Sequence, residues 1–391
     1  MAASPSMGNN ASAAEARRLV LLLDGTWNKR QDSTNVWRMR AMLRHGPQQR
    51  VYYDEGVGTA KGEAFKGGVF GSGLSAKVLN AYLWLMEQYE EAAESETGKA
   101  DAIFIFGFSR GAFTARSLVG LISIAGLLRR DAPTRIIDAV ELTQLEGLAE
   151  DSPIARDFRR RFSRTVEVRF IGLWDTVGAL GVPKVPGMPN FEFWGLEKNG
   201  HHKVEVLPRI VQHARHAIAL DEHRYAFDAT LWPDGRHAQS MEQRWFIGAH
   251  ANVGGGYGDD ALFLRPLQWL QHESIQQGLK FRQIVGALGD TFYGSGPRDS
   301  LGDIFYGAYK LTQWLRPHVR PVAFHTAANQ YVDFTVLERW IWHPLYEPKP
   351  LLPFLPRKPR RAPSARLSDT QIQDLMNLPA TAVSASRGFT L

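Results

Sequence analysis

Short apolar runs that end at a charged or turn-forming residue alternate along the chain with longer segments of helical character. The runs of strand length are Leu19 to Leu23, Val51 to Tyr53, Ile103 to Phe106, Val166 to Trp174, Ile218 to Leu220 and Arg244 to Ile247. Helical segments are expected from Ala76 to Ala93 and from Ala112 to Leu128. Strands that are apolar at nearly every position are typical of a sheet buried on both faces. The alternation predicts an α/β fold with a mostly parallel central sheet flanked by helices.

Five chemically active side chains stand immediately after predicted strands. They are Asp24, Asp54, Ser109, Asp175 and His250. The carboxyl ends of parallel strands meet at one edge of a sheet, and ligands of open α/β sheets bind at that edge. We therefore expect these five residues to gather there.

The chain divides into a core and a less regular C-terminal part. Residues 1–16 are small and polar and are expected to be disordered. Residues 17–285 carry the alternating pattern and form the predicted catalytic core, within which 183–206 is interrupted by Pro and Gly and is a candidate lid. Residues 286–391 are irregular and Pro-rich, with a helical fragment from Gly307 to Leu315, and are expected to pack on the core as a cap. The alternative for the lid and cap candidates is that these segments are loops that cover the sheet without a role at the site.

The most informative local pattern is Gly107-Phe108-Ser109-Arg110-Gly111 between a predicted strand and a predicted helix. This is the context of a nucleophile elbow, in which the serine has a strained backbone and glycines stand two residues before and after it. A tight turn with a serine N-cap would explain Ser109. It would not explain both Gly107 and Gly111 at that spacing.

A nucleophilic serine needs a base, and the base needs an acid that holds its tautomer. In chain order after Ser109, Asp175 is the best acid because it ends a buried strand, although an Asx cap of the next turn would also place an Asp there. His250 is the best base among 12 histidines, because it follows a strand and precedes Gly254-Gly255-Gly256. His325 is the reserve candidate.

Backbone N–H groups are expected to stabilise the oxyanion. One is the N–H of Arg110, and the second is that of Gly25 or Thr26 after the first strand. Asp24 could bind a cation or hydrogen-bond its own turn, and Asp54 is a secondary candidate. No metal-binding motif and no nucleotide loop occurs in the sequence, so we expect no cofactor.

The composition of the chain excludes several kinds of chemistry and of partner. The 391 residues carry a formal net charge of +6, have 44% hydrophobic content and contain no cysteine, which excludes disulfides and thiolate catalysis. No nucleic-acid-binding module is recognisable, and the basic cluster at 357–361 is short, so nucleic-acid partners are not expected. The N-terminal residues lack an apolar signal-peptide region. We expect synthesis in the cytoplasm and, if the protein is exported, a signal-independent route.

Six sequence blocks in order resemble a family of α/β-hydrolase domains that includes the type VI secretion lipase effectors with phospholipase activity. The blocks are Leu23-Asp24-Gly25-Thr26-Trp27-Asn28, Tyr53 to Thr59, Gly107 to Ala112, Leu173 to Gly178, His216 to Glu222 and Gly248 to Tyr257. The resemblance covers roughly residues 18–275 and implies an α/β-hydrolase fold, with nucleophile, acid and base at Ser109, Asp175 and His250. The family often has Asp where Asn252 stands. The resemblance also implies that the partner is a component of the secretion apparatus or an immunity protein.

Together these features predict a serine hydrolase that cleaves carboxylic esters through an acyl-enzyme on Ser109. The resemblance points to the acyl esters of membrane phospholipids. The apolar, aromatic and basic stretch 340–361 is compatible with peripheral contact with an anionic membrane, and equally with a Pro-rich surface tail. The alternatives are an esterase for small or polymeric non-lipid esters, and a catalytically inert binding protein on a hydrolase fold.

Overall fold

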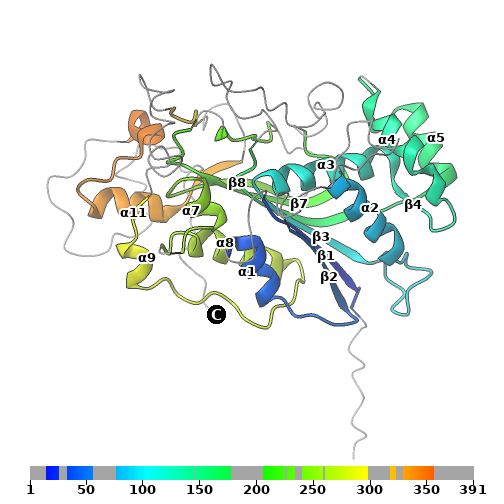
Figure 1. Ribbon diagram of the computed structural model, residues 1–391, viewed down its shortest axis with the longest axis horizontal. Helices are drawn as coiled ribbons and strands as arrows, with labels where there is room; N and C mark the ends of the chain where they lie inside the picture. The colour runs from blue at the N-terminus through cyan, green and yellow to red at the C-terminus, as the bar shows by residue number, and fades with distance from the viewer. Residues whose placement is uncertain are drawn as a thin grey trace, which may run out of the picture.

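A seven-stranded sheet runs through the computed structural model, which describes residues 15–25, 33–55, 76–145, 147–177, 206–224, 227–233, 240–258, 260–297, 318–322 and 329–355 (Figure 1). The strand order is β2-β1-β3-β6-β7-β8-β9, and every neighbouring pair is parallel. The strands of the sheet are β1 (Arg18–Leu23), β2 (Gln49–Asp54), β3 (Ala102–Phe108), β6 (Val168–Trp174), β7 (Val211–Ala219), β8 (Ser240–Phe246) and β9 (Gln330–Val332). All seven carboxyl ends consequently point to one edge.

Helices cover both faces of this sheet. The α-helices are α1 (Asn35–Met42), α2 (Ala76–Gln88), α3 (Arg110–Ala125), α4 (Ile136–Gln144), α5 (Pro153–Phe162), α7 (His250–Gly254), α8 (Leu264–Gln276), α9 (Asp290–Gly294) and α11 (Phe334–Trp342). Two 3-10 helices, η3 (Pro133–Arg135) and η6 (Lys349–Phe354), and a small antiparallel pair, β4 (Leu127–Leu128) with β5 (Ser163–Arg164), complete the described elements.

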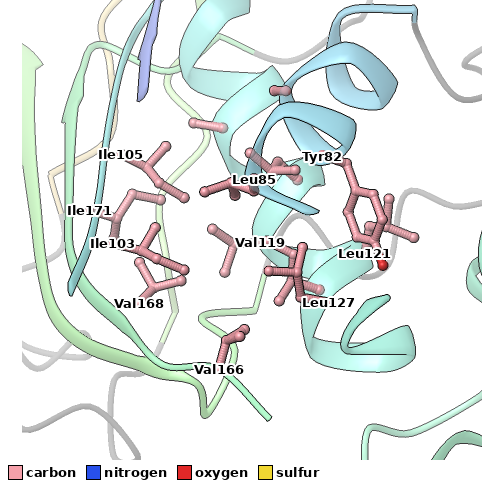
Figure 2. Close-up of a cluster of buried hydrophobic side chains, with 14 of the residues drawn as sticks. Tyr82, Leu85, Ile103, Ile105, Val119, Leu121, Leu127, Val166, Val168 and Ile171 are labelled. Carbon is pink, nitrogen blue, oxygen red and sulfur yellow. The ribbon is translucent and has the colours of Figure 1, made fainter. Parts of the chain in front are cut away.

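Alternate residues of the central strands enter two different cores. On one face, side chains of β1, β3 and β6 pack against α2 and α3; Figure 2 shows Ile103, Ile105 and Ile171 directed toward Leu85 and Val119. On the other face, the intervening residues of the same strands pack against α1 and α8. Each strand is apolar on both faces, so its side chains are buried on both sides of the sheet. Each buried Leu or Phe contributes about 1.5–3 kcal/mol to the stability of the fold. The predicted α/β layering is confirmed.

The C-terminal part of the chain takes part in this architecture. Strand β9 pairs in parallel with β8 and is the edge strand of the sheet. Helix α11 begins after its N-cap Asp333, whose side chain accepts a hydrogen bond from the Thr335 N–H. Val336, Leu337 and Trp340 of α11 then pack with Trp245 of β8 in a third buried cluster. Neither β9 nor α11 is predicted from the sequence.

Several element bounds differ from the sequence prediction, and the differences have physical reasons. The strand predicted at 218–220 is the end of β7, which begins at Val211. The first part of β7 contains polar residues and so lacks the apolar pattern of a buried strand. These residues are accommodated by partners in the structure, since Arg215 is paired with Glu273 and His216 contacts Gln243. The helix predicted to reach residue 93 ends at Gln88. The lid candidate up to residue 205, the fragment 307–315 and residues 1–14 lie outside the described residues.

Candidate active site

Ser109 stands at the junction of β3 and α3, where the two glycines of the motif are required by close backbone contacts. Its φ of 58° and ψ of −122° are values that L-residues rarely adopt. A Cβ at Gly107 would lie 2.6 Å from the carbonyl oxygen of Gly111, and a Cβ at Gly111 would lie 2.1 Å from the carbonyl oxygen of Leu23. Both neighbours are backbone atoms, which cannot rotate away. The elbow therefore presses α3 against the end of β1.

We predict that Gly111→Ala destabilises the protein, because the new methyl group overlaps the Leu23 and Asp24 carbonyls of a buried strand end. The expected loss is about 3 kcal/mol in the free energy of unfolding, measured by urea denaturation. Gly46→Ala is the matched control, since a Cβ there meets nothing within 4 Å, and it should change stability by less than about 0.5 kcal/mol. Equal stability of the two variants would contradict this account of the elbow.

The structure brings Ser109, Asp175 and His250 into one hydrogen-bonded chain. His250 Nε2 lies 2.8 Å from Ser109 Oγ, and His250 Nδ1 lies 2.6 Å from Asp175 Oδ2. The three residues come from the ends of β3, β6 and β8, which lie at the same edge of the sheet. Ser109 and His250 are 8% and 6% exposed, and Asp175 is fully buried. The structure therefore brings together the three residues that the sequence analysis expects to serve as nucleophile, acid and base.

The ionisation of Asp175 fixes the tautomer of His250. Burial alone would raise the pKa of Asp175, but the Arg320 guanidinium and the contact with His250 outweigh burial and hold that pKa well below its ordinary range. An ionised carboxylate only accepts hydrogen bonds. His250 Nδ1 therefore carries the proton that is donated to Asp175, and Nε2 is left to accept the Ser109 hydroxyl proton.

Aromatic rings enclose the imidazole of His250. Phe108 packs at 4.6 Å between ring centroids, and Phe227 meets the imidazole edge-on at 5.0 Å. Phe108 in turn fills the space beside Gly254, where a Cβ would overlap its ring. The backbone N–H of His250 donates to Glu222 Oε2 at 3.2 Å. These contacts fix the position and the ring plane of the base.

We predict that the acid limb of the pH profile of kcat/KM lies below the ordinary histidine value of about 6.5. Burial lowers the pKa of His250, and the Asp175 carboxylate offsets this only in part. The base works when neutral, so a lowered pKa keeps it competent at more acidic pH. Initial rates on a soluble ester across pH measure the limb. An apparent pKa clearly above 6.5 would contradict this view of the buried imidazole.

The predicted oxyanion donors are placed differently from one another. The Arg110 N–H belongs to the first turn of α3, where the helix itself supplies no acceptor for the N–H groups and the helix dipole favours negative charge. The Gly25 N–H instead donates to Asp24 Oδ1 at 2.8 Å. It is thus engaged by its neighbour's carboxylate in this structure. Thr26 lies outside the described residues.

Asp24 and Asp54 lie at the predicted edge but are tied into the scaffold. Asp24 Oδ2 accepts hydrogen bonds from Thr34 Oγ1 at 2.6 Å and from the Tyr53 hydroxyl at 3.1 Å. Asp54 pairs with Lys77, whose pKa burial lowers to about 8. Within the described residues, no group of three or more His, Asp or Glu side chains is arranged to hold a metal ion. The two carboxylates anchor the ends of β1 and β2.

Two polar residues near the triad have structural partners. His216 is buried in β7 and accepts a hydrogen bond from the Thr176 N–H at 3.0 Å; burial lowers its pKa to about 3, so the ring is neutral. Asn252 Oδ1 accepts from the Ala249 N–H at 2.8 Å, and Asn252 Nδ2 donates to Asp260 at 3.0 Å. The asparagine therefore fixes the start of α7, which presents His250. His325, the reserve base, lies outside the described residues.

Arg320 is a residue of the site that the sequence does not predict. Its guanidinium contacts both carboxylate oxygens of Asp175, at 2.7 Å and 3.0 Å, and its side chain is fully buried. The two residues are 145 positions apart, and no motif surrounds Arg320. No local pattern in the sequence could have placed it at the triad.

A cavity of about 390 Å³ lies between α4 and α5, away from this site. Arg159 of α5 donates to the carbonyls of Ser123 and Ile124, which places the cavity beside the C-terminal end of α3. Ser109 caps the opposite end of that helix, which has 16 residues and is roughly 24 Å long. The cavity is consequently not the space in which an ester would meet Ser109. None of the helices in the described ranges is long and apolar enough to cross a bilayer.

A parallel sheet flanked by helices, with a serine elbow after β3 and an acid and a histidine at later strand ends, defines an α/β hydrolase. Residues 17–273 match the family described as the catalytic domain of Tle1-like phospholipase effectors of the type VI secretion system, and the chain belongs to that family.

Individual proteins are similar to this chain at low sequence identity. An uncharacterised protein of Saccharomyces cerevisiae is 28% identical over 250 residues, which are 57% of this chain and 33% of the yeast protein. The chain thus spans a third of the length of that relative. Among solved structures, an uncharacterised protein from Pseudomonas aeruginosa is 17% identical with a TM-score of 0.43, covering 77% of this chain and 51% of that one.

Two further solved structures are similar at the same level. The Tle1 effector, solved bound to the VgrG spike, is 21% identical with a TM-score of 0.34, covering 68% of this chain and 58% of that chain. A butyrate-bound esterase from Thermogutta terrifontis is 14% identical with a TM-score of 0.36, covering 70% of this chain and 88% of the esterase.

Proposed function

We propose that this protein is a serine hydrolase that cleaves carboxylic esters through an acyl-enzyme on Ser109. The observation that carries the proposal is the unbroken chain of hydrogen bonds from Ser109 Oγ through His250 to Asp175. Membership of a phospholipase effector family supports the same reaction class. An inert binding protein on this fold would have no need for a strained serine aligned with a neutral histidine.

In the acylation step, Ser109 Oγ attacks the ester carbonyl carbon while His250 Nε2 takes the hydroxyl proton. The carbonyl oxygen becomes an oxyanion, which the Arg110 N–H at the start of α3 stabilises. When this intermediate collapses, the C–O bond to the alcohol breaks and His250 returns the proton to the leaving alkoxide. Asp175 stays ionised and stabilises the imidazolium throughout.

Deacylation repeats these steps with water as the nucleophile. His250 Nε2 takes a proton from water, and the resulting hydroxide adds to the acyl carbon of the Ser109 ester. Collapse of the second intermediate breaks the Ser109 ester bond, and His250 protonates Ser109 Oγ. The products are a carboxylic acid and an alcohol, and the site regains its starting state.

We propose membrane phospholipid as the substrate and signal-independent type VI secretion as the export route. Membership of residues 17–273 in the Tle1-like phospholipase effector family supports both proposals. A component of the secretion apparatus is the corresponding candidate partner, together with an immunity protein. The oxyanion site at Arg110 would receive the acyl carbonyl, whereas the phosphate headgroup would stay with the leaving lysophospholipid.

Vesicles of phosphatidylethanolamine and phosphatidylglycerol test the substrate. The expected products, resolved by mass spectrometry, are a free fatty acid and the matching lysophospholipid, with neither formed by Ser109→Ala. Release of phosphatidic acid would contradict acyl-ester cleavage. Hydrolysis of p-nitrophenyl butyrate without any fatty-acid release from vesicles would instead support the alternative, an esterase for non-lipid esters.

A further inference from the structure

Each carboxylate oxygen of Asp175 accepts two hydrogen bonds. Oδ1 accepts from the Ala219 N–H at 2.9 Å and from Arg320 Nη1 at 2.7 Å. Oδ2 accepts from Arg320 Nη2 at 3.0 Å and from His250 Nδ1 at 2.6 Å. A guanidinium that contacts both carboxylate oxygens fixes the carboxylate plane as well as its position.

Arg320 also ties together three segments around the base. Its Nη1 donates to the Ala219 carbonyl at 2.7 Å at the end of β7, and its Nη2 donates to the Phe227 carbonyl. Phe227 is the residue whose ring meets the His250 imidazole edge-on. Arg320 lies beyond the 17–273 family match, so a residue outside the matched domain reaches the centre of the site.

The position of Arg320 has an electrostatic consequence. Arg320 Nη2 and His250 Nδ1 share the same oxygen, Asp175 Oδ2. The other charged groups that face His250 are Glu222 and Arg224, which pair with each other at 2.7 Å. A permanent positive charge on the far side of Asp175 opposes the pull of the carboxylate on an imidazolium.

We propose that Arg320 is a positioning residue of the triad, which locks the plane of Asp175 and weakens its hold on the His250 proton. The inference rests on the proposed function, since it assigns Arg320 a role in that reaction. Among the described residues, Arg320 hydrogen-bonds to Asp175 and to the Ala219 and Phe227 carbonyls, and it acts on His250 through Asp175.

The test measures the second-order rate constant for fluorophosphonate labelling between about pH 5 and 9. Arg320→Met removes the charge. The apparent pKa of the acid limb of the labelling profile should therefore rise by about one unit or more, and the labelling rate constant on the high-pH plateau should fall about 10- to 100-fold. Arg320→Lys keeps the positive charge but loses the bidentate contact with the Asp175 carboxylate. Its acid limb should therefore stay in place, while its plateau rate falls about 10-fold.

Arg164→Met is the matched control for loss of a buried arginine. Arg164 is 4% exposed and donates to the carbonyls of Met86, Tyr89 and Leu128, away from the triad. This variant should lower Tm without moving the limb or the plateau. A merely structural role for Arg320 would give the same behaviour at both positions.

A folded Arg320→Met with the wild-type limb would overturn the inference, and so would an Arg320→Lys that labels at the wild-type rate at every pH. If Arg320→Met does not fold, Arg320→Lys alone decides. The wild-type reaction separates the two claims. A reactive wild-type Ser109 beside indistinguishable Arg320 variants removes only this inference, whereas an unreactive wild type overturns the proposed function as well.

Discussion

Ser109→Ala should lower kcat for ester hydrolysis by about 10⁴- to 10⁶-fold, because the variant has no nucleophile for the acyl-enzyme route. Its fold should be intact, since among the described residues the hydrogen bond that Ser109 Oγ makes is the one to His250 Nε2. The small alanine side chain replaces a hydroxyl in the same strained position. Initial rates on p-nitrophenyl butyrate, with circular dichroism as a check on folding, measure the effect.

Ser117→Ala is the matched control for this variant. Ser117 lies two turns further along α3, and its hydroxyl donates to the Phe113 carbonyl at 3.0 Å. Its removal deletes a serine hydroxyl from the same helix and should leave the rate unchanged. Wild-type activity in Ser109→Ala, or an equal loss in both variants, would contradict the assignment of Ser109.

Asp175→Asn should reduce kcat about 10⁴-fold and also destabilise the protein. An amide in place of the carboxylate can donate to His250 Nδ1 and so stabilise the wrong tautomer, in which Nε2 carries the proton and cannot accept the Ser109 proton. The same change removes the counter-charge of the fully buried Arg320 side chain. Removing one partner of a buried ion pair and leaving the other charge unpaired lowers the free energy of unfolding by about 3–5 kcal/mol, which urea denaturation would measure.

Asp101→Asn separates the two effects. Asp101 is also buried, pairs with Arg17 at 2.6 Å and accepts a hydrogen bond from the Glu90 N–H. It lies before β3, at the opposite end of that strand from Ser109. The control should lose stability while keeping its kcat. If Asp175→Asn kept its kcat as well, Asp175 would be a structural residue only.

The proximity of Ser109, Asp175 and His250 could be predicted because the position of each residue follows from local chemistry. A buried parallel strand is apolar on both faces, so the polar residue that ends it stands out, as Asp175 does after Trp174. The glycines around Ser109 reflect close contacts that only the elbow imposes. His250 is separated from the end of β8 by three residues, stands at the first position of α7 and precedes a glycine-rich turn. Parallel topology then brings these ends to one edge without any knowledge of tertiary contacts.

Other features depend on contacts that no local pattern encodes. Arg320 reaches Asp175 across 145 residues, and the surrounding sequence gives no sign of burial. The first half of β7 is hidden by polar side chains whose partners come from other elements, as with Arg215 and Glu273. The sequence predicts the Gly25 N–H as an oxyanion donor, whereas in the structure this group donates to Asp24 Oδ1. In each case a tertiary contact decides the role of the residue.

The central claim is that Ser109 is a nucleophile activated by His250. The most direct test is to treat the protein with a fluorophosphonate at neutral pH and map the covalent adduct by mass spectrometry. The account predicts one adduct per chain, on Ser109 in the tryptic peptide of residues 100–110, absent in Ser109→Ala and formed far more slowly in His250→Gln. No adduct, or an adduct on another residue, would contradict it.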